Sequence, residues 1–197
     1  MQSQHNGSNL KTVGLKDSDL TETCISSEII ASGGMLTAKR DQVRLPNGKQ
    51  SQREYIIHPG AVLAVPILPN GNILFERQFR YPLNQVFIEL PAGKIDPNET
   101  PLETGKRELL EETGYTAKNW VSMGLQHPCI GYSNEVIHNF LALDLSLAQH
   151  KPDEDEALQL FELSMDEALL FIKQGKITDA KTIIALYQAH TYLRVAV

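Results

Sequence analysis

The sequence has few of the features that mark specialised classes of protein. Its two cysteines, Cys24 and Cys129, do not have the spacing of a metal site, so we expect buried or idle thiols. No apolar stretch is long enough to span a membrane, and residues 1–10 are too polar for a signal peptide. No stretch is strongly basic and the net charge is −6, which argues against a nucleic-acid-binding surface. We therefore expect a cytoplasmic protein that binds neither nucleic acid nor membranes.

The most informative feature that is present is a run of residues with fixed spacing between Gly93 and Gly114. Glu99 follows Gly93 after five residues, and the segment Arg107-Glu108-Leu109-x-Glu111-Glu112-x-Gly114 follows after seven more. At roughly 6% usage for each residue type, seven such matches have odds on the order of one in a million in a chain of this length. The run therefore requires a functional explanation.

The second half of this run predicts a helix that begins after Thr100 and ends before Gly114. Thr100 is a good N-cap, Pro101 suits the first helical position, and Glu103 completes a capping box with Thr100. Gly114 suits the left-handed residue that ends a helix. The boundaries of the helix thus follow from local chemistry alone.

Three glutamates gather on one face of this helix. Glu108 and Glu112 lie four residues apart, with side-chain origins about 5–6 Å from each other, and Glu111 borders the same face. Arg107 precedes Glu111 by four residues, so it can pair with Glu111 and hold it in place. Carboxylates this close repel one another, and a bound cation relieves the repulsion. Oxygen ligands without His or Cys nearby favour Mg²⁺, with Mn²⁺ as a substitute, over Zn²⁺.

The alternative interpretation of the glutamates is a solvated acidic helix, because most runs of charge are only that. Gly93 and Glu99 lie outside the helix and still fit the same site. Their presence favours the metal-binding interpretation.

The rest of the chain predicts an α/β (α+β) protein with one main domain. The composition, 42% hydrophobic over 197 residues, is enough for one core with a short appendage. Residues 1–27 are polar and are expected to form a flexible arm. Residues 28–60 are expected to form a β-hairpin extension, and residues 61–197 the main domain. Strands and helices alternate irregularly without a repeat, which favours a mixed β-sheet sandwiched between α-helices.

Turn and capping signals divide these segments further. Two hairpins are predicted, one with strands 35–44 and 50–57 and the other with strands 62–68 and 73–77. Ser164 with Glu167 predicts a capping box at the start of a later helix, and Asp179 caps the last helix.

The run between Gly93 and Gly114 resembles the signature of the Nudix hydrolases, which cleave a nucleoside diphosphate linked to another group. Motifs outside it resemble the ADP-ribose pyrophosphatase branch of that family. These motifs are Arg53-Glu54, His58 to Val62, Gln78 to Pro82, Glu89 to Gly93, Gly131 to His138 and Gly175 to Asp179. The resemblance covers residues 28–192 and implies the Nudix fold, with the hairpin 28–60 joining two subunits into a homodimer.

The resemblance also implies roles for residues around the metal. The backbone carbonyl of Ala92 would bind a cation beside Glu108 and Glu112, with Glu111 bridging through metal or water. Glu89 is either a residue that orients ligands or substrate, or a buried satisfied carboxylate.

Residues outside the helix are candidates for binding the substrate. Arg80 suits a diphosphate because a guanidinium binds phosphate oxygens in a fork; the alternative is an ordinary surface arginine. Arg53 and Glu54 end the first hairpin and would act across the dimer; the alternative is a surface ion pair of little energetic value. Glu135 lies in a loop and is kept as a further substrate-binding candidate.

The resemblance also implies a catalytic base in the acidic segment 153–156, because family members place a glutamate on a loop that follows the core sheet. Glu156 is the first choice and Glu154 the second, with Glu135 as an outside candidate, while a solvated acidic loop is the alternative for the whole segment.

Two departures from the ADP-ribose branch keep other substrates open. Ile130 precedes Gly131 where those enzymes tend to have a proline, and Tyr55 is the only aromatic residue of the first hairpin. The sequence thus predicts Mg²⁺-dependent hydrolysis of a nucleoside diphosphate sugar, ADP-ribose first, to a nucleoside monophosphate and a sugar phosphate. GDP-mannose, UDP-glucose or a dinucleotide are alternative substrates, and a nucleotide-sugar sensor without turnover is the alternative of another class.

Overall fold

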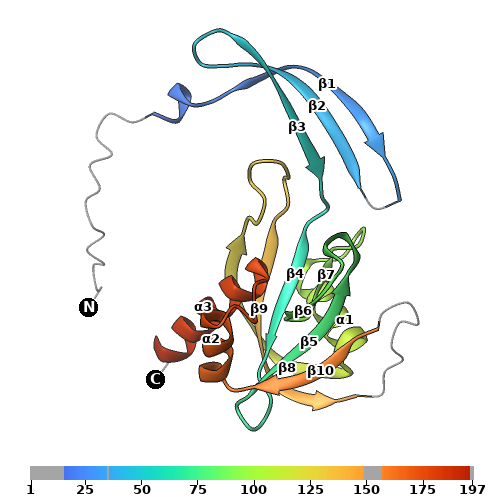
Figure 1. The fold of residues 1–197 in the computed structure, drawn as a ribbon, viewed down its shortest axis with the longest axis vertical. Helices are drawn as coiled ribbons and strands as arrows, with labels where there is room; N and C mark the ends of the chain where they lie inside the picture. Colours follow the sequence, from blue (N-terminus) through green and yellow to red (C-terminus); the bar gives the residue numbers. More distant parts are fainter. Residues whose placement is uncertain (1–15, 35, 149–156, 196–197) are drawn as a thin grey trace. The chain divides into compact units, whose positions relative to one another are not determined.

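The structure, a computed structural model, describes residues 16–34, 36–148 and 157–195 (Figure 1). The chain divides into two compact units, of which one ends at Ile57 and the other begins at His58. Within the described residues, no helix has both the length and the apolar character needed to cross a bilayer.

The first unit is a three-stranded antiparallel sheet in the order β1-β2-β3. A 3₁₀ turn, η1 (Asp17–Asp19), precedes β1 (Thr23–Ser32), β2 (Thr37–Arg44) and β3 (Gln50–Ile57). The predicted hairpin of β2 and β3 is present, paired from Thr37 with Ile57 to Arg44 with Gln50.

Strand β1 begins inside the segment expected to be a flexible arm, so the sheet starts earlier than the sequence indicated. Every side chain of β1 is exposed, and the strand therefore lacks the alternation of buried and exposed residues by which half-buried strands are identified. Its backbone pairing with β2 holds it in place. Residues 1–15 of the expected arm lie outside the described residues.

The second unit contains two sheets. The mixed sheet has the order β7-β4-β9-β8, with β7 (Ala92–Lys94), β4 (Ala61–Pro66), β9 (Ile137–Leu147) and β8 (Tyr115–Gln126). Only β4 and β9 run parallel in it. The second sheet is antiparallel in the order β10-β5-β6, with β10 (Gln159–Leu163), β5 (Ile73–Arg80) and β6 (Gln85–Glu89). The helices are η2 (Tyr81–Leu83), α1 (Pro101–Thr113), α2 (Met165–Lys173) and α3 (Ala180–Val195).

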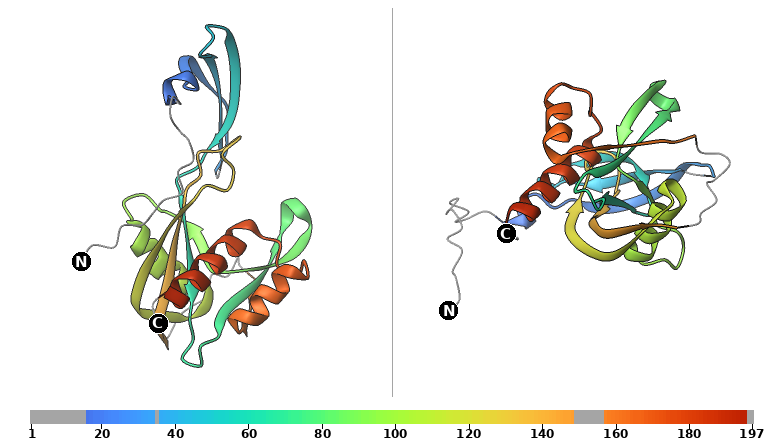
Figure 2. Two further views of the ribbon diagram at one scale, coloured as in Figure 1. Left: turned by 90° about the vertical axis from the view of Figure 1, so that its left-hand side faces the viewer. Right: turned by 90° about the horizontal axis from the view of Figure 1, so that it is seen from below.

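The mixed sheet lies between α1 and α3, as the sequence predicted (Figure 2). Strand β4 is buried along its whole length, because its alternate side chains face different helices. Leu63 and Val65 belong to the core cluster that includes Leu186 of α3. Val62 instead lies toward α1, where its Cγ1 is 3.1 Å from the position that a Cβ on Gly105 would occupy.

The second predicted hairpin is wrong in its pairing. Strands β4 and β5 belong to different sheets and are linked only by a turn, closed by the Leu68 N–H donating to Asn72 O at 2.8 Å, and by an isolated bridge between Ile67 and Ile73. Turn residues determine where the chain reverses. They do not determine which strand each arm pairs with, and here β9 and β7 pair with β4 instead.

The predicted helix ends are confirmed. Thr100 and Glu103 form a reciprocal capping box on α1, which ends at Gly114 with φ 74°. Ser164 caps α2 in the same way, and Asp179 accepts from the Thr182 N–H at 3.1 Å on α3. The cap of α1 fixes where its charged face lies relative to β7.

Candidate active site

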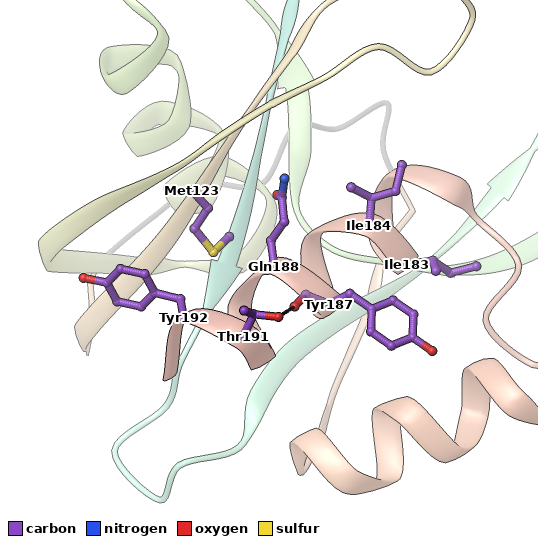
Figure 3. A pocket seen from close by; sticks show the side chains of 7 residues that line it. All are labelled: Met123, Ile183, Ile184, Tyr187, Gln188, Thr191 and Tyr192. Atoms are coloured by element: carbon purple, nitrogen blue, oxygen red, sulfur yellow. Dashed lines mark hydrogen bonds between the residues drawn. The ribbon is translucent and has the colours of Figure 1, made fainter. Parts of the chain in front are cut away.

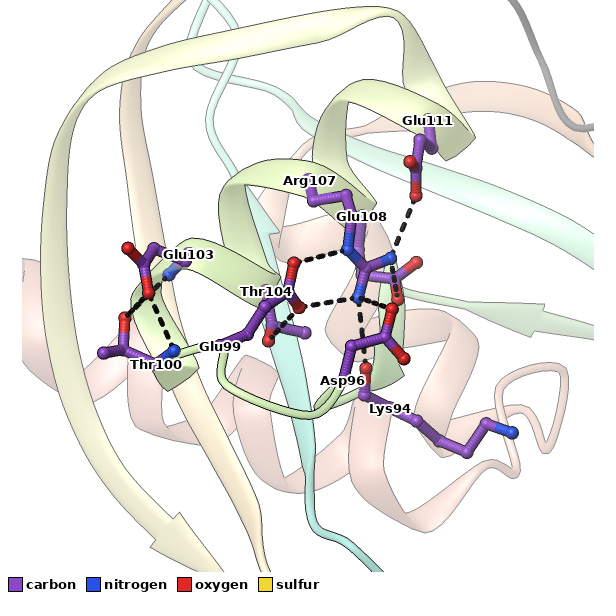
Figure 4. A network of polar contacts seen from close by, with 9 residues as sticks. All are labelled: Lys94, Asp96, Glu99, Thr100, Glu103, Thr104, Arg107, Glu108 and Glu111. Atoms are coloured by element: carbon purple, nitrogen blue, oxygen red, sulfur yellow. Dashed lines mark hydrogen bonds and ion pairs between the residues drawn. The ribbon is translucent and has the colours of Figure 1, made fainter. Parts of the chain in front are cut away.

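Arg107 is the centre of a network that joins α1 to the loop before it (Figure 4). Its Nε and Nη2 donate to the two carboxylate oxygens of Glu99 at 2.9 and 3.0 Å. Its Nη1 donates to Glu108 at 2.8 Å and to Glu111 at 3.0 Å, so the expected pair with Glu111 is present. Nη2 also donates to Lys94 O at 3.2 Å. One guanidinium thus sets the positions of three carboxylates.

Glu99 is the residue that ties the loop to the helix. Its Oε2 accepts from Thr104 Oγ1 at 2.8 Å in addition to Arg107. The hydrogen bonds from Arg107, and then that from Thr104, lower the pKa of Glu99 to about 2. In the reverse direction, Glu99 raises the pKa of Arg107. Both groups are therefore charged at neutral pH, which keeps the loop fixed.

Gly93 lies directly against the carboxylate of Glu108. A Cβ on Gly93 would be 1.9 Å from both Cδ and Oε1 of Glu108 and 2.5 Å from Oε2. Gly93 is paired with Val62 in the sheet, so its backbone cannot move aside freely. The glycine is required because only an absent side chain leaves room for this carboxylate.

Glu112 reaches the same strand from the next turn of α1. Its Oε2 accepts from the Ala92 N–H at 3.0 Å. The structure therefore brings the carboxylates of Glu108 and Glu112 against β7 at Ala92 and Gly93. Ala92, Glu108 and Glu112 are three of the four expected cation-binding residues. The fourth, Glu111, is joined to Glu108 through Arg107.

The donor set has the chemistry of a site for a hard divalent cation, since every group is a carboxylate or carbonyl oxygen. The space at Gly93 that a Cβ would fill is taken by one of these carboxylates, which also fits a site built for a metal. Among the described residues, no three His, Cys, Asp or Glu side chains are grouped closely enough to hold a metal ion. Arg107 binds Glu108 and Glu111, and the Ala92 amide binds Glu112.

A second charged cluster lies at the ends of β5 and β6. Arg80 donates from Nε and Nη2 to the two oxygens of Glu89 at 2.7 and 2.8 Å. Lys181 donates to Glu89 and, at 2.8 Å, to Asp179. These residues line a cavity of about 300 Å³ together with Leu83, Phe87, Thr178 and Ala180. Sequence reasoning missed Lys181, whose only signal is its place two residues after the motif ending at Asp179.

The other predicted substrate-binding residues lie beside basic side chains or carboxylates. Glu135 lies 3.7 Å from Nε2 of His58. Within the first unit, Arg53 pairs with Glu22, and Glu54 with Arg40 at 2.8 Å. The candidate bases Glu154 and Glu156 lie outside the described residues.

A roomier cavity, of about 570 Å³, lies along α3 and has a different character (Figure 3). It is lined by Met123, Ile183, Ile184, Tyr187, Gln188, Thr191 and Tyr192. Among the described residues no charged side chain lines it, so it offers no carboxylate, amine or guanidinium for chemistry at phosphorus. The charged surface of α1 and β7 is therefore the better candidate for an active site.

The chain is similar in sequence to several known proteins. The sequence profile of the NUDIX domain matches residues 57–186. The chain is 40% identical over 169 residues to an ADP-ribose pyrophosphatase of Bacillus subtilis (strain 168), covering 85% of this chain and 91% of that protein. It is 41% identical over 169 residues to a methanol dehydrogenase activator of Bacillus methanolicus, with coverages of 84% and 90%.

Two further similarities are more distant. A GDP-mannose pyrophosphatase of Yersinia enterocolitica serotype O:8 / biotype 1B is 33% identical over 142 residues, which are 68% of this chain and 74% of that protein. The crystal structure of an ADP compounds hydrolase shares the fold with a TM-score of 0.81 at 22% identity, covering 89% of this chain and 95% of that one.

Proposed function

Because this chain belongs to the Nudix family of hydrolases, we propose that it cleaves the diphosphate bond of a nucleoside diphosphate sugar. ADP-ribose is the first candidate, giving AMP and ribose 5-phosphate, since the Bacillus subtilis relative is an ADP-ribose pyrophosphatase. The observation that carries the proposal is the packing of the Glu108 carboxylate on Gly93. A position that has room for a carboxylate only because the residue is glycine indicates a site in which the position of that carboxylate matters.

We assign the cation, Mg²⁺ or in its place Mn²⁺, to Glu108, Glu112, Glu111 and the carbonyl of Ala92. When bound, such a cation neutralises the diphosphate and lowers the pKa of a bound water. Arg107 orients two of these carboxylates through its Nη1. Its charge also lessens their mutual repulsion.

Arg80 is proposed to bind the diphosphate, and Glu135 to contact the substrate from its loop. The side chain of Arg80 is 42% exposed, so a part of its guanidinium can meet a phosphate oxygen. Glu156 or Glu154 is proposed as the base that takes the proton of the attacking water.

We further propose that the first unit joins two copies of the chain. Its edge strand β1 exposes Ile25, Ile29 and Ile30 at 46%, 65% and 40%. An edge strand with exposed apolar side chains offers backbone groups that another strand can pair with. In such a homodimer Arg53 and Glu54 would complete the substrate site of the partner subunit. Sedimentation analysis of the full chain tests this, and a monomer at micromolar concentration would exclude it.

The test of the function is turnover of ADP-ribose, GDP-mannose, UDP-glucose and NADH with Mg²⁺, by the wild type and by Glu112→Gln. Glu162→Gln, at an exposed position of β10, is the matched control. We expect ADP-ribose to be cleaved fastest, with kcat/KM reduced about 100-fold or more in Glu112→Gln and unchanged in the control. If another substrate is cleaved faster, that compound replaces ADP-ribose as the proposed substrate. Binding of a nucleotide sugar without turnover would favour the sensor instead.

The 41% identity to a methanol dehydrogenase activator favours a second candidate role, activation of a dehydrogenase. Its test is the rate of methanol oxidation by a methanol dehydrogenase with and without this chain. An unchanged rate at equimolar protein would reject the role.

A further inference from the structure

We propose that Glu89 is a positioning residue, which aims the guanidinium of Arg80 at the substrate, and that Lys181 holds Glu89 in place. Arg80, Glu89, Lys181 and Asp179 are called the clamp below. This inference rests on the proposed function, because it takes Arg80 as the group that binds the diphosphate.

The hairpin of β5 and β6 places the members of the clamp on one face. Glu76 pairs with Glu89, and Arg80 with Gln85. Directly paired residues point to the same side of a sheet, as do alternate residues along a strand. Arg80 and Glu89 therefore share a face, and Phe87, which lines the same cavity, lies between Gln85 and Glu89 on it. The side chain of Arg80 extends along this face to reach Glu89.

The contact between Arg80 and Glu89 fixes an orientation because it has two bonds and one buried partner. The side chain of Glu89 is 3% exposed, against 42% for Arg80. Nε and Nη2 of Arg80 both donate to Glu89, which determines the plane of the guanidinium. A guanidinium has five N–H groups, so those on Nη1 are directed away from the buried carboxylate. The exposed edge of the guanidinium is the part that a phosphate oxygen can approach.

Glu89 is also held in its charged form by α3. Lys181 donates to it and also to Asp179. The Leu90 N–H donates to Thr182 Oγ1 at 3.0 Å, and Thr182 is fully buried. The first turn of α3 is thereby attached to the end of β6. The carboxylate of Glu89 cannot rotate without breaking bonds to two separate elements.

The charges around Glu89 support its assignment as the residue that positions Arg80. Burial acts to raise the pKa of Glu89, but the bonds from Arg80 and Lys181 outweigh it, and the pKa is lowered overall. Glu76, paired with Glu89 on the same face of the sheet, adds a further carboxylate that raises the pKa of Arg80. Of the charged side chains that line the cavity of about 300 Å³, that of Arg80 is the most exposed.

The clamp also borders the residues assigned to the metal. Glu89 precedes Ala92 by three residues, and three residues span at most about 10 Å of extended chain. The Ala92 N–H donates to Glu112. The carboxylate that holds Arg80 and the residue assigned to the cation are therefore close neighbours along the chain.

A double-mutant cycle separates positioning from a merely structural role. The variants are Glu89→Gln, Arg80→Ala and the two together, with kcat and KM measured for ADP-ribose and thermal unfolding measured alongside. We expect Glu89→Gln to lower kcat/KM about 10- to 100-fold, since a displacement near 1 Å costs that much. In the Arg80→Ala background the same change should have no further effect on kcat/KM, whereas a structural role would multiply the two losses.

Two further variants keep the test decisive. Arg77→Ala is the matched control, because Arg77 is exposed on the same strand and donates to Gln159 at 2.9 Å; its kcat/KM should be unchanged. If Glu89→Gln does not fold, Lys181→Met takes its place in the cycle, with an expected loss of about threefold to tenfold that disappears in Arg80→Ala.

The outcomes distinguish this inference from the proposed function. Turnover of ADP-ribose by the wild type tests the proposed function alone. If the wild type cleaves another nucleotide sugar instead, that sugar is the substrate used in the cycle. If Arg80→Ala retains wild-type kcat/KM, or if the losses of the two variants multiply, the positioning role of Glu89 is overturned while the hydrolase remains. If the wild type cleaves nothing, the cycle is carried out on the Kd of ADP-ribose, where additive losses again overturn the role.

Discussion

Replacing Gly93 by alanine places a methyl group where the Glu108 carboxylate now lies. The added Cβ would be 1.9 Å from Cδ and Oε1 of Glu108. Ordinary contact distances between such atoms are about 3.5 Å, so the carboxylate must retreat by on the order of 1.5 Å. Glu108 is the group that yields, because it is the end of a flexible side chain while Gly93 is paired in the sheet. The variant therefore moves a proposed cation ligand and leaves the backbone in place.

The expected effect on catalysis is much larger than the effect on stability. A misplacement of about 1 Å in an active site costs roughly 100-fold in rate. A side chain forced off its rotamer costs about 0.5–1.5 kcal/mol, and a Gly→Ala change returns about 0.4–1 kcal/mol by restricting the unfolded chain. The backbone of Gly93 does not have a positive φ, so no strain is added. We expect the free energy of unfolding to change by less than about 1 kcal/mol, which for a chain of this size shifts Tm by about 2–4 °C at most.

The assay combines steady-state hydrolysis over a titration of Mg²⁺ with thermal unfolding. Gly93→Ala should lower kcat/KM about 100-fold and raise the Mg²⁺ concentration that gives half-maximal activity. Gly34→Ala is the control, because its Cβ would meet no atom within 4 Å. Activity within threefold of wild type would refute the requirement for Glu108 at this position. A loss of more than about 3 kcal/mol of stability would refute the argument that the side chain yields.

Three further predictions concern stability. Ser164→Ala removes the capping box of α2 and should lower the free energy of unfolding by about 1 kcal/mol, measured in urea, with activity retained; an unchanged midpoint would contradict it. Leu186→Ala, at a fully buried position of α3, should cost about 2–5 kcal/mol by the same measurement, and a cost below 1 kcal/mol would remove Leu186 from the core. The lowered pKa of Glu89 means that its contribution to stability is present above the ordinary carboxyl pKa of 4.5 and is lost as pH falls below it. Urea unfolding from pH 3 to 7 should show a weaker acid dependence for Glu89→Gln than for wild type, and equal slopes would exclude this linkage.

Features that depend on neighbouring residues could be predicted from the sequence. The capping box at Thr100, the left-handed Gly114 and the pair between Arg107 and Glu111 all involve residues within four positions of one another. Their geometry follows from the helix itself, so the charged face of α1 was correct in detail. The sandwich of helices around a mixed sheet also follows, because alternating apolar strands and capped helices leave few other arrangements.

Features that depend on distant parts of the chain could not be predicted. The signals for β4 and β5 correctly marked a turn, but β4 pairs with β7 and β9, and β5 pairs with β6 and β10. Strand β1 has no buried face and gives no periodic signal. Lys181 reaches Glu89 from another element, and no spacing rule connects them. The clamp on Arg80 was therefore visible only once the fold was known.

The parallel pair of β4 and β9 has a consequence for the order in which the second unit acquires its structure. Ala61 pairs with Ile137, so α1 and β8 lie in the loop that this pairing closes. Closing a long loop costs entropy before its contacts form, and folds with such pairings form slowly. The helix that carries Glu108 and Glu112 can form early from its own caps, while the strand beneath it stays unpaired on one edge. Completion of the catalytic surface thus waits for β9, and we expect folding intermediates to contain α1 before they bind substrate.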